Sequence, residues 1–358
     1  MFQDKYVFVQ LTAFLNRTQF NNYVRKYDGN RYVKHFTCWN QLLAMMFGQL
    51  SYRESLRDLI VALEAHRATQ YHLGLGRNTI VKATLAYANQ TRDYRIFENF
   101  AFYMMKEACK KREISILNIP GKKYAFDSTT IPLCLATFPW AKFRSKKGGV
   151  KAHVLYDVEA QVPAFYTVTT ASKHDSTAMS SITYEPNRYY IFDRAYDTFK
   201  ELYKIHLTGS YYVVRSKTNL KYKMVKWKRR MPMNVLTDAE VKLTGYLSEK
   251  KYPESFRFIR YYDEEDDCEF TFLTNAKHLS ALDVANLYKK RWLVELFFKW
   301  LKQHLKIKRF WGTTKNAVRI QISVAIITYC LVAIVHHDMQ LKRSTYEVLQ
   351  ILSISLTD

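Results

Sequence analysis

The order of the apolar segments between residues 123 and 217 restricts the fold more than any other feature of the sequence. Three successive segments have the alternation and the β-branched and aromatic content of strands: KYAFDSTTI (123–131), VKAHVLYDV (150–158) and VPAFYTVTT (162–170). Four more follow: a helical stretch near 174–182, the apolar strand YYIFDRAY (189–196), an amphipathic helix in TFKELYKIHLTG and the strand YYVVRSK (211–217). This alternation of strands and helices predicts an α/β fold.

Three strands, a helix, a strand, a helix and a strand, in that order, predict a ribonuclease-H-like sheet. Because such a fold serves many functions, the order by itself indicates no activity. Residues 218–280 interrupt it with KYKMVKWKRR, VKLTGYLS, FRFIRYYD and EFTFLTN, which alternate as antiparallel strands do and predict a β-rich insertion. A helix is then expected to begin at Ser280, with Asp283 three residues later as in a capping box, and to run through residues 287–304.

The chain has 358 residues and a formal net charge of +23. Residues 1–118, 119–280 and 281–358 carry +8, +8 and +7, so the basicity is not confined to a tail. An excess of positive charge on every folded segment is expected of a protein that lies along a polyanion. Nucleic acid is therefore the leading candidate partner. The alternative is that the charge only keeps the protein in solution.

Other features of the composition bear on the compartment. The five cysteines stand singly, with neither disulfide-framework nor zinc-ligand spacing, which favours a reducing compartment. The N-terminus, MFQDKYVFVQLTAFLN, lacks the long apolar run of a signal peptide. The longest apolar run, ISVAIITYCLVAIV (322–335), is short for a membrane span and predicts a buried core helix. We therefore expect a cytoplasmic protein with no membrane partner.

Residues 1–118 have a helical pattern. CWNQLLAMMFGQL and ESLRDLIVALEAH place apolar residues three and four positions apart, HLGLGRNT (72–79) is a glycine-marked break, and TLAYANQTRDYRIFENFAFYMMKEACKKR resumes the pattern. A compact basic helical unit could place a helix in a DNA groove or could be a structural cap on the next domain. The sequence supports both interpretations equally.

The stretch LYKKRWLVELFFKWLKQH (287–304) holds five cations and a single carboxylate, Glu295, among mostly apolar and aromatic residues. At about 100° per helical residue, four side chains fall on one stripe roughly 60° wide: Tyr288, Arg291, Glu295 and Lys302. One interpretation is a chain of i,i+4 ion pairs, Arg291–Glu295–Lys299, worth only about 0.3–0.5 kcal/mol per pair. Because Tyr288 and Lys302 do not belong to such a chain, we favour a functional role for Glu295.

Two aspartates stand where strands are predicted to end. Asp127 lies at the end of the first strand, before three hydroxyl residues, and Asp193 closes the strand that begins at residue 189. A carboxylate there is costly unless it is paired or binds a metal, although Asp127 could form a turn and Asp193 could pair with Arg194. Together with Glu295 they would form an oxygen-rich site of the kind that Mg²⁺ prefers, and two such ions promote in-line phosphoryl transfer.

These residues carry a family resemblance. The spacing of Tyr288, Arg291, Glu295 and Lys302 resembles the Tyr-Arg-Glu-Lys signature of bacterial insertion-sequence DDE transposases of the IS-four type. YAFDSTTI resembles the first aspartate segment of that family and YIFDRAY the second, and a β-rich insertion before the glutamate is also typical. NRYVKHFTCWNQLLAMMFGQLSYRESLRDL resembles the helical domain that precedes the catalytic domain in one branch. The resemblance covers nearly the whole chain.

The resemblance implies a transposase that moves DNA by a cut-and-paste route. Asp127, Asp193 and Glu295 would be its catalytic residues and would bind two Mg²⁺ ions, for which Mn²⁺ would substitute. A water-driven nick at each end of the element would precede attack by the freed 3′-hydroxyl, and the sequence leaves open whether a hairpin forms on the way. The partners would be double-stranded DNA, as terminal repeats and as target, and a second copy of the chain in a synaptic homodimer. The protein would work at the bacterial nucleoid.

Several side chains are candidates for DNA contacts. By the resemblance, Tyr288, Arg291 and Lys302 would hold phosphates near the cleaved end, and the nearby cations Arg194 and Lys299 are further candidates. Trp292 and Trp311 could stack on a flipped base, although core positions are the more common use of such tryptophans. The segment 217–230 carries seven cations and no acid, and could bind DNA or be a solvated strand face. Its candidate contacts are Lys226, Lys228, Arg229 and Arg230.

The chain is expected to divide into a helical N-terminal DNA-binding domain (1–118), a ribonuclease-H-like catalytic domain (119–335, with the insertion at about 218–280) and a C-terminal tail (336–358). Ala195 stands where the family commonly has glycine, and it could misplace Asp193 if that position required a positive φ, although alanine is a mild change. Two rival functions are a structure-selective nuclease, which would not need the Tyr-Arg-Glu-Lys stripe, and a catalytically inactive, transposon-derived DNA-binding protein.

Overall fold

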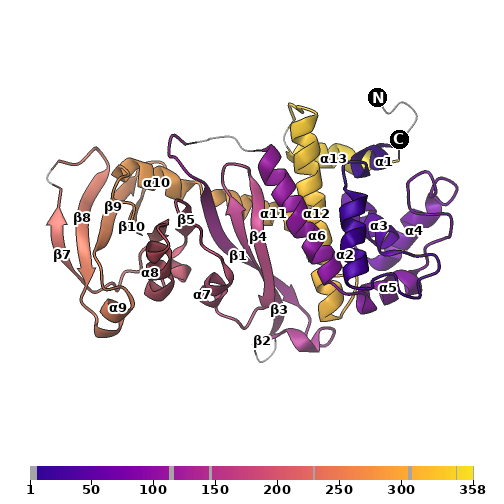
Figure 1. Ribbon diagram of the computed structural model, residues 1–358, viewed down its shortest axis with the longest axis horizontal. Helices are drawn as coiled ribbons and strands as arrows, with labels where there is room; N and C mark the ends of the chain where they lie inside the picture. Colours follow the sequence, from indigo (N-terminus) through magenta and orange to yellow (C-terminus); the bar gives the residue numbers. More distant parts are fainter. Residues whose placement is uncertain are drawn as a thin grey trace.

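The computed structural model describes residues 6–112, 117–144, 147–228, 230–304, 309–343 and 345–357, and of residues 144, 304, 345 and 346 the backbone alone. The molecule is elongated, with helices at one end, a mixed sheet in the middle and the strands of the insertion at the other end (Figure 1). The N-terminal region is helical, as predicted: α1 (Val7–Thr12), α2 (Arg17–Lys26), α3 (Cys38–Leu50), α4 (Leu56–Ala65), α5 (Lys82–Thr91) and α6 (Arg95–Lys111).

The central sheet has the predicted strand order. Its strands are β1 (Lys123–Leu133), β2 (Lys142–Arg144), β3 (Lys147–Asp157), β4 (Val162–Thr170), β5 (Tyr189–Phe192) and β6 (Tyr211–Arg215). The short helices η1 (Pro139–Ala141), α7 (Asp175–Ala178), η2 (Met179–Ser181) and η3 (Arg194–Tyr196) and the longer α8 (Phe199–Leu207) lie between them. β3 pairs antiparallel with β1 and β4, whereas β1, β5 and β6 are parallel neighbours. The order β4-β3-β1-β5-β6 confirms the ribonuclease-H-like fold.

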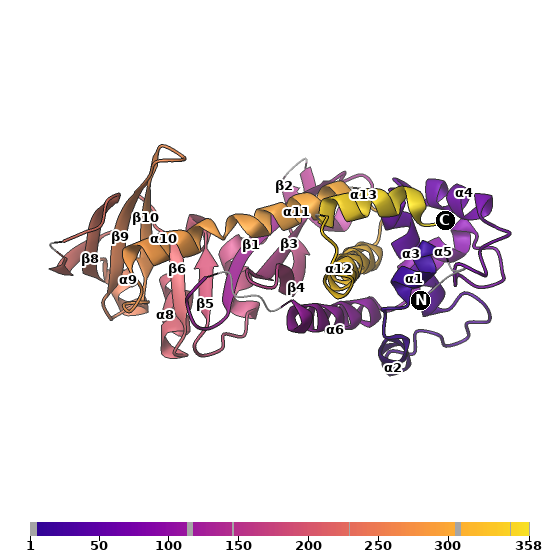
Figure 2. The ribbon, with the colours of Figure 1, turned by 90° about the horizontal axis from the view of Figure 1, so that it is seen from above.

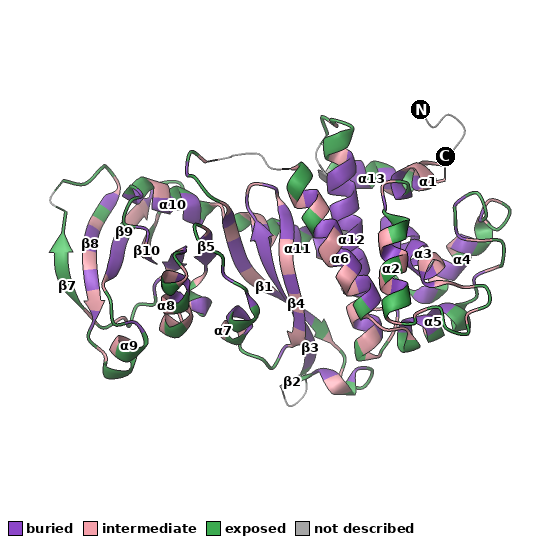
Figure 3. Ribbon diagram, in the orientation of Figure 1, coloured by how far each residue is buried: buried purple, intermediate pink, exposed green. Residues whose placement is uncertain are grey.

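The insertion continues the same sheet beyond β6. Its strands are β7 (Tyr222–Trp227), β8 (Val235–Leu243), β9 (Phe256–Asp263) and β10 (Cys268–Thr274), in the spatial order β10-β9-β8-β7. This confirms the β-rich insertion, with one correction: the segment 241–248 is not all strand, because α9 (Tyr246–Lys251) begins after Gly245. β7 is the outer strand, and all but its first residue are exposed (Figure 3).

The helix expected to run through residues 287–304 is in fact two helices, α10 (Ala281–Lys289) and α11 (Trp292–His304). The predicted capping box at Ser280 and Asp283 is present. At the junction, Arg291 N–H donates to the Tyr288 carbonyl at 2.9 Å, and the next bonds also join residues three positions apart. The helical turn is therefore tighter at the junction, but the chain does not change direction there. α10 and α11 therefore follow one face of the sheet, and α8 lies on the other (Figure 2).

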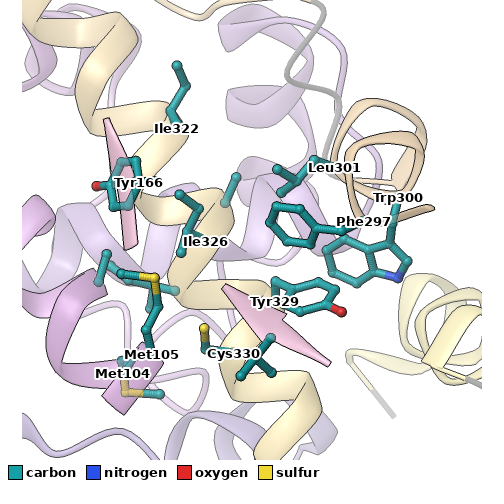
Figure 4. Close-up of a cluster of buried hydrophobic side chains, with 14 of the residues drawn as sticks. Met104, Met105, Tyr166, Phe297, Trp300, Leu301, Ile322, Ile326, Tyr329 and Cys330 are labelled. Carbon is teal, nitrogen blue, oxygen red and sulfur yellow. The ribbon is translucent and has the colours of Figure 1, made fainter. Parts of the chain in front are cut away.

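A long apolar helix, α12 (Lys315–Asp338), joins the sheet to the N-terminal helices, and α13 (Thr345–Ser355) follows it. α12 is long and apolar enough to span a membrane, but 94% of its most apolar window is buried inside the protein, as predicted for a core helix. Figure 4 shows Ile326 and Tyr329 of this helix among side chains of α6, β4 and α11. One buried cluster thus continues from the N-terminal helices to the sheet. The division at residues 118 and 335 stays a prediction.

Candidate active site

Asp127 does not end β1, contrary to the prediction, because β1 continues to Leu133 against β3. The parallel pairing with β5 does end there: its last register pair is Phe126 with Phe192. Asp127 and Asp193 are therefore the next residues on two adjacent parallel strands, at the sheet edge where ligands of α/β proteins commonly bind. Because β1 continues, the interpretation of Asp127 as a turn residue is wrong.

Asp193 is followed by η3, so the strand is shorter than the predicted 189–196. Ala195 lies inside η3 and is not among the residues with positive φ, so alanine is tolerated without strain. The Tyr288 hydroxyl donates to Asp193 Oδ1 at 3.3 Å. The described residues contain no ion pair between Asp193 and Arg194, so the pairing alternative for Asp193 is not borne out.

Arg291 connects the other two acids. Its Nη1 donates to Asp127 Oδ2 at 2.8 Å, and its Nη2 donates to Glu295 Oε1. The Arg291 side chain is 14% exposed, against 18% for Asp127 and 35% for Glu295. The i,i+4 pair of the alternative interpretation exists, but its guanidinium also reaches a strand on another part of the chain. A surface stripe of ion pairs does not explain that contact.

Burial dominates the electrostatics of this group. It raises the pKa of Asp127 to about 6, although the Arg291 guanidinium and the Ser128 N–H favour the carboxylate. Glu295 and Asp193 raise the pKa of Asp127 further through repulsion, because they lie close to it. Burial also raises the pKa of Tyr288 to about 12, so its phenol stays protonated and remains a donor to Asp193.

The three acids supply the oxygen ligands that suit a hard divalent cation, and two of them, Asp127 and Glu295, already bind one organic cation, the Arg291 guanidinium. In the part of the chain that the structure describes, however, no three His, Cys, Asp or Glu side chains are arranged to hold a metal ion. Arg291 binds one oxygen of Asp127 and one of Glu295, and Tyr288 binds one oxygen of Asp193.

The other residues predicted to contact DNA differ in how far they are exposed. Lys302 is half-buried on α11, and Arg194 and Lys299 are exposed. Trp292 is 58% exposed, so the alternative that places it in the core is wrong, whereas Trp311 is buried, as the core alternative predicts. Trp292 borders a cavity of about 520 Å³ that Tyr288 and Arg291 also line.

The basic segment lies at the far end of the sheet, on β7 and the residues after it. Lys226 and Arg230 are exposed there, whereas Lys228 is paired with Asp238 at 3.1 Å. Arg229 lies outside the described residues. The structure thus does not bring these cations to the three acids.

Sequence reasoning missed a polar cluster on the opposite face of β1. The Ser128 hydroxyl donates to Asp175 Oδ1 at 2.6 Å, and Lys151 Nζ lies 3.0 Å from both oxygens of Asp175. His153, fully buried, lies 3.9 Å from the same carboxylate. Because side chains alternate along β1, Asp127 lies on one face of the sheet and Ser128 on the other. The cluster therefore binds β1 on the face opposite to Asp127. A lysine and a histidine two positions apart in an apolar strand were the sequence signal that could have indicated this cluster.

Comparison with known proteins supplies the family. The family model described as the transposase DDE domain matches residues 120–331, more than half of the chain and all three acids. The chain belongs to the DDE transposase family. Members of this family depend on divalent metal ions in general. Residues 3–76 match a second model, described as a domain of unknown function.

Three curated relatives carry transposase names. "Putative transposase y4zB" of Sinorhizobium fredii is 35% identical over 230 residues, 63% of either chain. "Probable transposase for insertion sequence element IS5377" of Geobacillus stearothermophilus is 29% identical over 246 residues, 68% of this chain and 64% of the relative. "Putative transposase for insertion sequence element IS4SA" of Synechocystis is 26% identical over 269 residues, 72% and 73% of the two chains. This chain spans slightly less than two thirds of the first two relatives.

Among solved structures, a piggyBac transposase synaptic complex with hairpin DNA is similar, with 12% identity and a TM-score of 0.49. The likeness covers 97% of this chain and 79% of that one. At such a distance it adds nothing to the site, and the DDE transposase assignment rests on the family model.

Proposed function

We propose that this chain is a transposase that cuts DNA at the ends of its own element and joins the freed ends to target DNA. The observation that carries the proposal is the meeting of Asp127, Asp193 and Glu295, from two strands and a helix, at one guanidinium and one phenol. Membership of the DDE transposase family supports the same chemistry. A cut-and-paste route, with a nick at each end followed by attack of the 3′-hydroxyl, is the form we propose.

The three acids would hold two Mg²⁺ ions, with Mn²⁺ as a substitute. Bound there, the ions would activate the attacking oxygen and stabilise the leaving oxygen of the phosphoryl transfer. Tyr288 and Arg291 would orient the scissile phosphate, because a phenol and a planar guanidinium both donate to phosphate oxygens. Lys302, Lys299 and Arg194 would add positive charge along the same strand of DNA.

The N-terminal region would bind DNA as well. A cavity of about 810 Å³ there is bordered by Arg31, Lys34 and Arg77, and within the described residues none of these cations is paired with a carboxylate. Arg31 and Arg77 lie 5.0 Å from the ring centres of Tyr32 and Tyr71, both exposed. Cations without acidic partners beside exposed aromatic rings suit a phosphate backbone, which favours a DNA-binding role over a structural cap.

The exposed cations Lys226, on β7, and Arg230, after it, support a further DNA contact, and Arg229, which lies outside the described residues, stays a candidate by its sequence alone. Lys228 can join them only by leaving Asp238. We propose sequence-specific binding to the terminal repeats, with two copies of the chain in the synaptic complex. The protein would work at the nucleoid in the cytoplasm, where its DNA lies.

The test is a cleavage assay on a supercoiled plasmid that carries the gene's own flanking ends, with Mg²⁺ and the purified full chain. Glu295→Gln and Asp193→Asn each remove one charge from the site, and Glu269→Gln removes one from an exposed pair on β10. We expect cuts at the element boundaries that vanish in the two site variants and persist in Glu269→Gln. Cuts unrelated to the ends would favour a nuclease, and DNA binding without any cut would favour an inactive DNA-binding protein.

A further inference from the structure

Arg291 binds two of the acids that are expected to hold metal. Its guanidinium donates to Asp127 at 2.8 Å and to Glu295, and these acids come from β1 and α11. The carboxylates are two of the three expected to bind metal. One organic cation therefore joins acids that otherwise repel each other.

The guanidinium is incompletely satisfied in this position. Arg291 Nε is buried and finds no hydrogen-bond partner among the residues that the structure describes. A buried donor without a partner costs free energy. Arg291 would therefore gain from an arrangement in which all of its N–H groups are hydrogen-bonded. The centre of the Tyr288 ring lies 5.8 Å from the guanidinium carbon.

A divalent cation and the guanidinium would compete for these carboxylates. Metal binding needs direct contact with carboxylate lone pairs, Arg291 now binds one oxygen of Asp127 and one of Glu295, and two cations side by side repel each other. A DNA phosphate offers Arg291 another anion, which the planar guanidinium can bind in a bidentate manner.

We propose that Arg291 is an exchangeable counter-ion, which holds Asp127 and Glu295 until a divalent metal replaces it and which then binds the DNA phosphate. This rests on the proposed function and deepens it, since it makes metal binding and DNA binding mutually reinforcing. Metal releases Arg291 to the phosphate, and the phosphate draws Arg291 away from the acids. By reciprocity each ligand raises the affinity for the other by the same factor.

The experiment is calorimetric titration of the purified full chain with Mn²⁺, with and without a short duplex of the element end. Arg291→Ala removes the competitor, Arg291→Lys keeps a charge without the planar fork, and Arg260→Ala removes an arginine from an exposed pair as the matched control. Without DNA, we expect Arg291→Ala to bind Mn²⁺ at least roughly fivefold more tightly than wild type, and Arg291→Lys to fall between them. DNA should tighten Mn²⁺ binding to wild type and to Arg260→Ala, and not to Arg291→Ala.

Equal or weaker Mn²⁺ affinity in both folded Arg291 variants, or an unchanged effect of DNA, would overturn the counter-ion role. Glu295→Gln separates this result from failure of the proposed function. If wild type binds Mn²⁺ and Glu295→Gln does not, the metal site stands and only the role of Arg291 is wrong. If Glu295→Gln binds as wild type does, or nothing binds, the metal site and the counter-ion role fall together.

Discussion

A buried ion pair in the insertion gives a sharp stability prediction. Arg257 of β9 donates from Nε and Nη2 to the two oxygens of Asp238 on β8, both at 2.7 Å, and from Nη1 to the Leu279 carbonyl. Both side chains are almost fully buried. Because Leu279 directly precedes the cap of α10 at Ser280, the pair fixes the segment from which the Tyr288 helix starts. Asp238→Asn keeps the shape and removes the charge.

The expected loss of stability in Asp238→Asn follows from the groups that stay buried after the substitution. Arg257 would be a buried cation without a counter-ion, and breaking a buried pair in this way costs about 3–5 kcal/mol. The asparagine oxygen still accepts one hydrogen bond, so we expect about 3 kcal/mol. The matched change is Glu269→Gln, which breaks the pair with Arg260 at 2.6 Å on the same sheet, with side chains 49% and 44% exposed. Exposed pairs contribute about 0–1 kcal/mol, so this variant should stay within that range.

The assay is urea unfolding followed by circular dichroism at pH 7 and again at acid pH. Burial would raise the pKa of Asp238, but hydrogen bonds from Arg257 and Lys228 hold it below its ordinary value. A lowered folded-state pKa contributes stability above the unfolded value of about 3.9, and this is lost as pH falls through the folded value. The gap between wild type and Asp238→Asn should therefore close in acid. Equal losses in Asp238→Asn and Glu269→Gln, or a gap independent of pH, would refute the reasoning.

Three further changes test a buried histidine, a close helix contact and a helix cap. Burial lowers the pKa of His153 to about 4, so the contribution of His153 to the free energy of unfolding should fall by up to about 3 kcal/mol as pH drops from 6.5 to 4, and the difference in stability between wild type and His153→Asn should change with pH over that range. Gly48→Ala would place a methyl group 2.6 Å from the Trp311 ring, and thermal melting should show a loss of about 1–3 kcal/mol unless the ring shifts freely. Ser280→Ala removes the capping box shared with Asp283 and should cost about 1 kcal/mol in urea unfolding, an expectation that an unchanged midpoint would contradict.

The sequence by itself determined the elements and their order. Alternation of apolar residues gave the strands of the sheet and the insertion, and helical spacing located α3 with both of its ends. The candidate acids could also be found, because a carboxylate beside an apolar strand or helix face stands out chemically. These features are local: a few neighbouring residues decide them.

Tertiary structure decided how the candidates meet. The break between α10 and α11 does not show in the apolar pattern, because that pattern continues across residues 290 and 291. Asp127 lies in mid-strand because β3 continues to pair with β1 after β5 has stopped, and a single strand's sequence does not specify where each neighbour ends. The contact between Arg291 and Asp127 joins residues 164 positions apart in the sequence. Such contacts depend on how the sheet twists and on which helix lies on it, so they follow from the packed chain and not from any local segment.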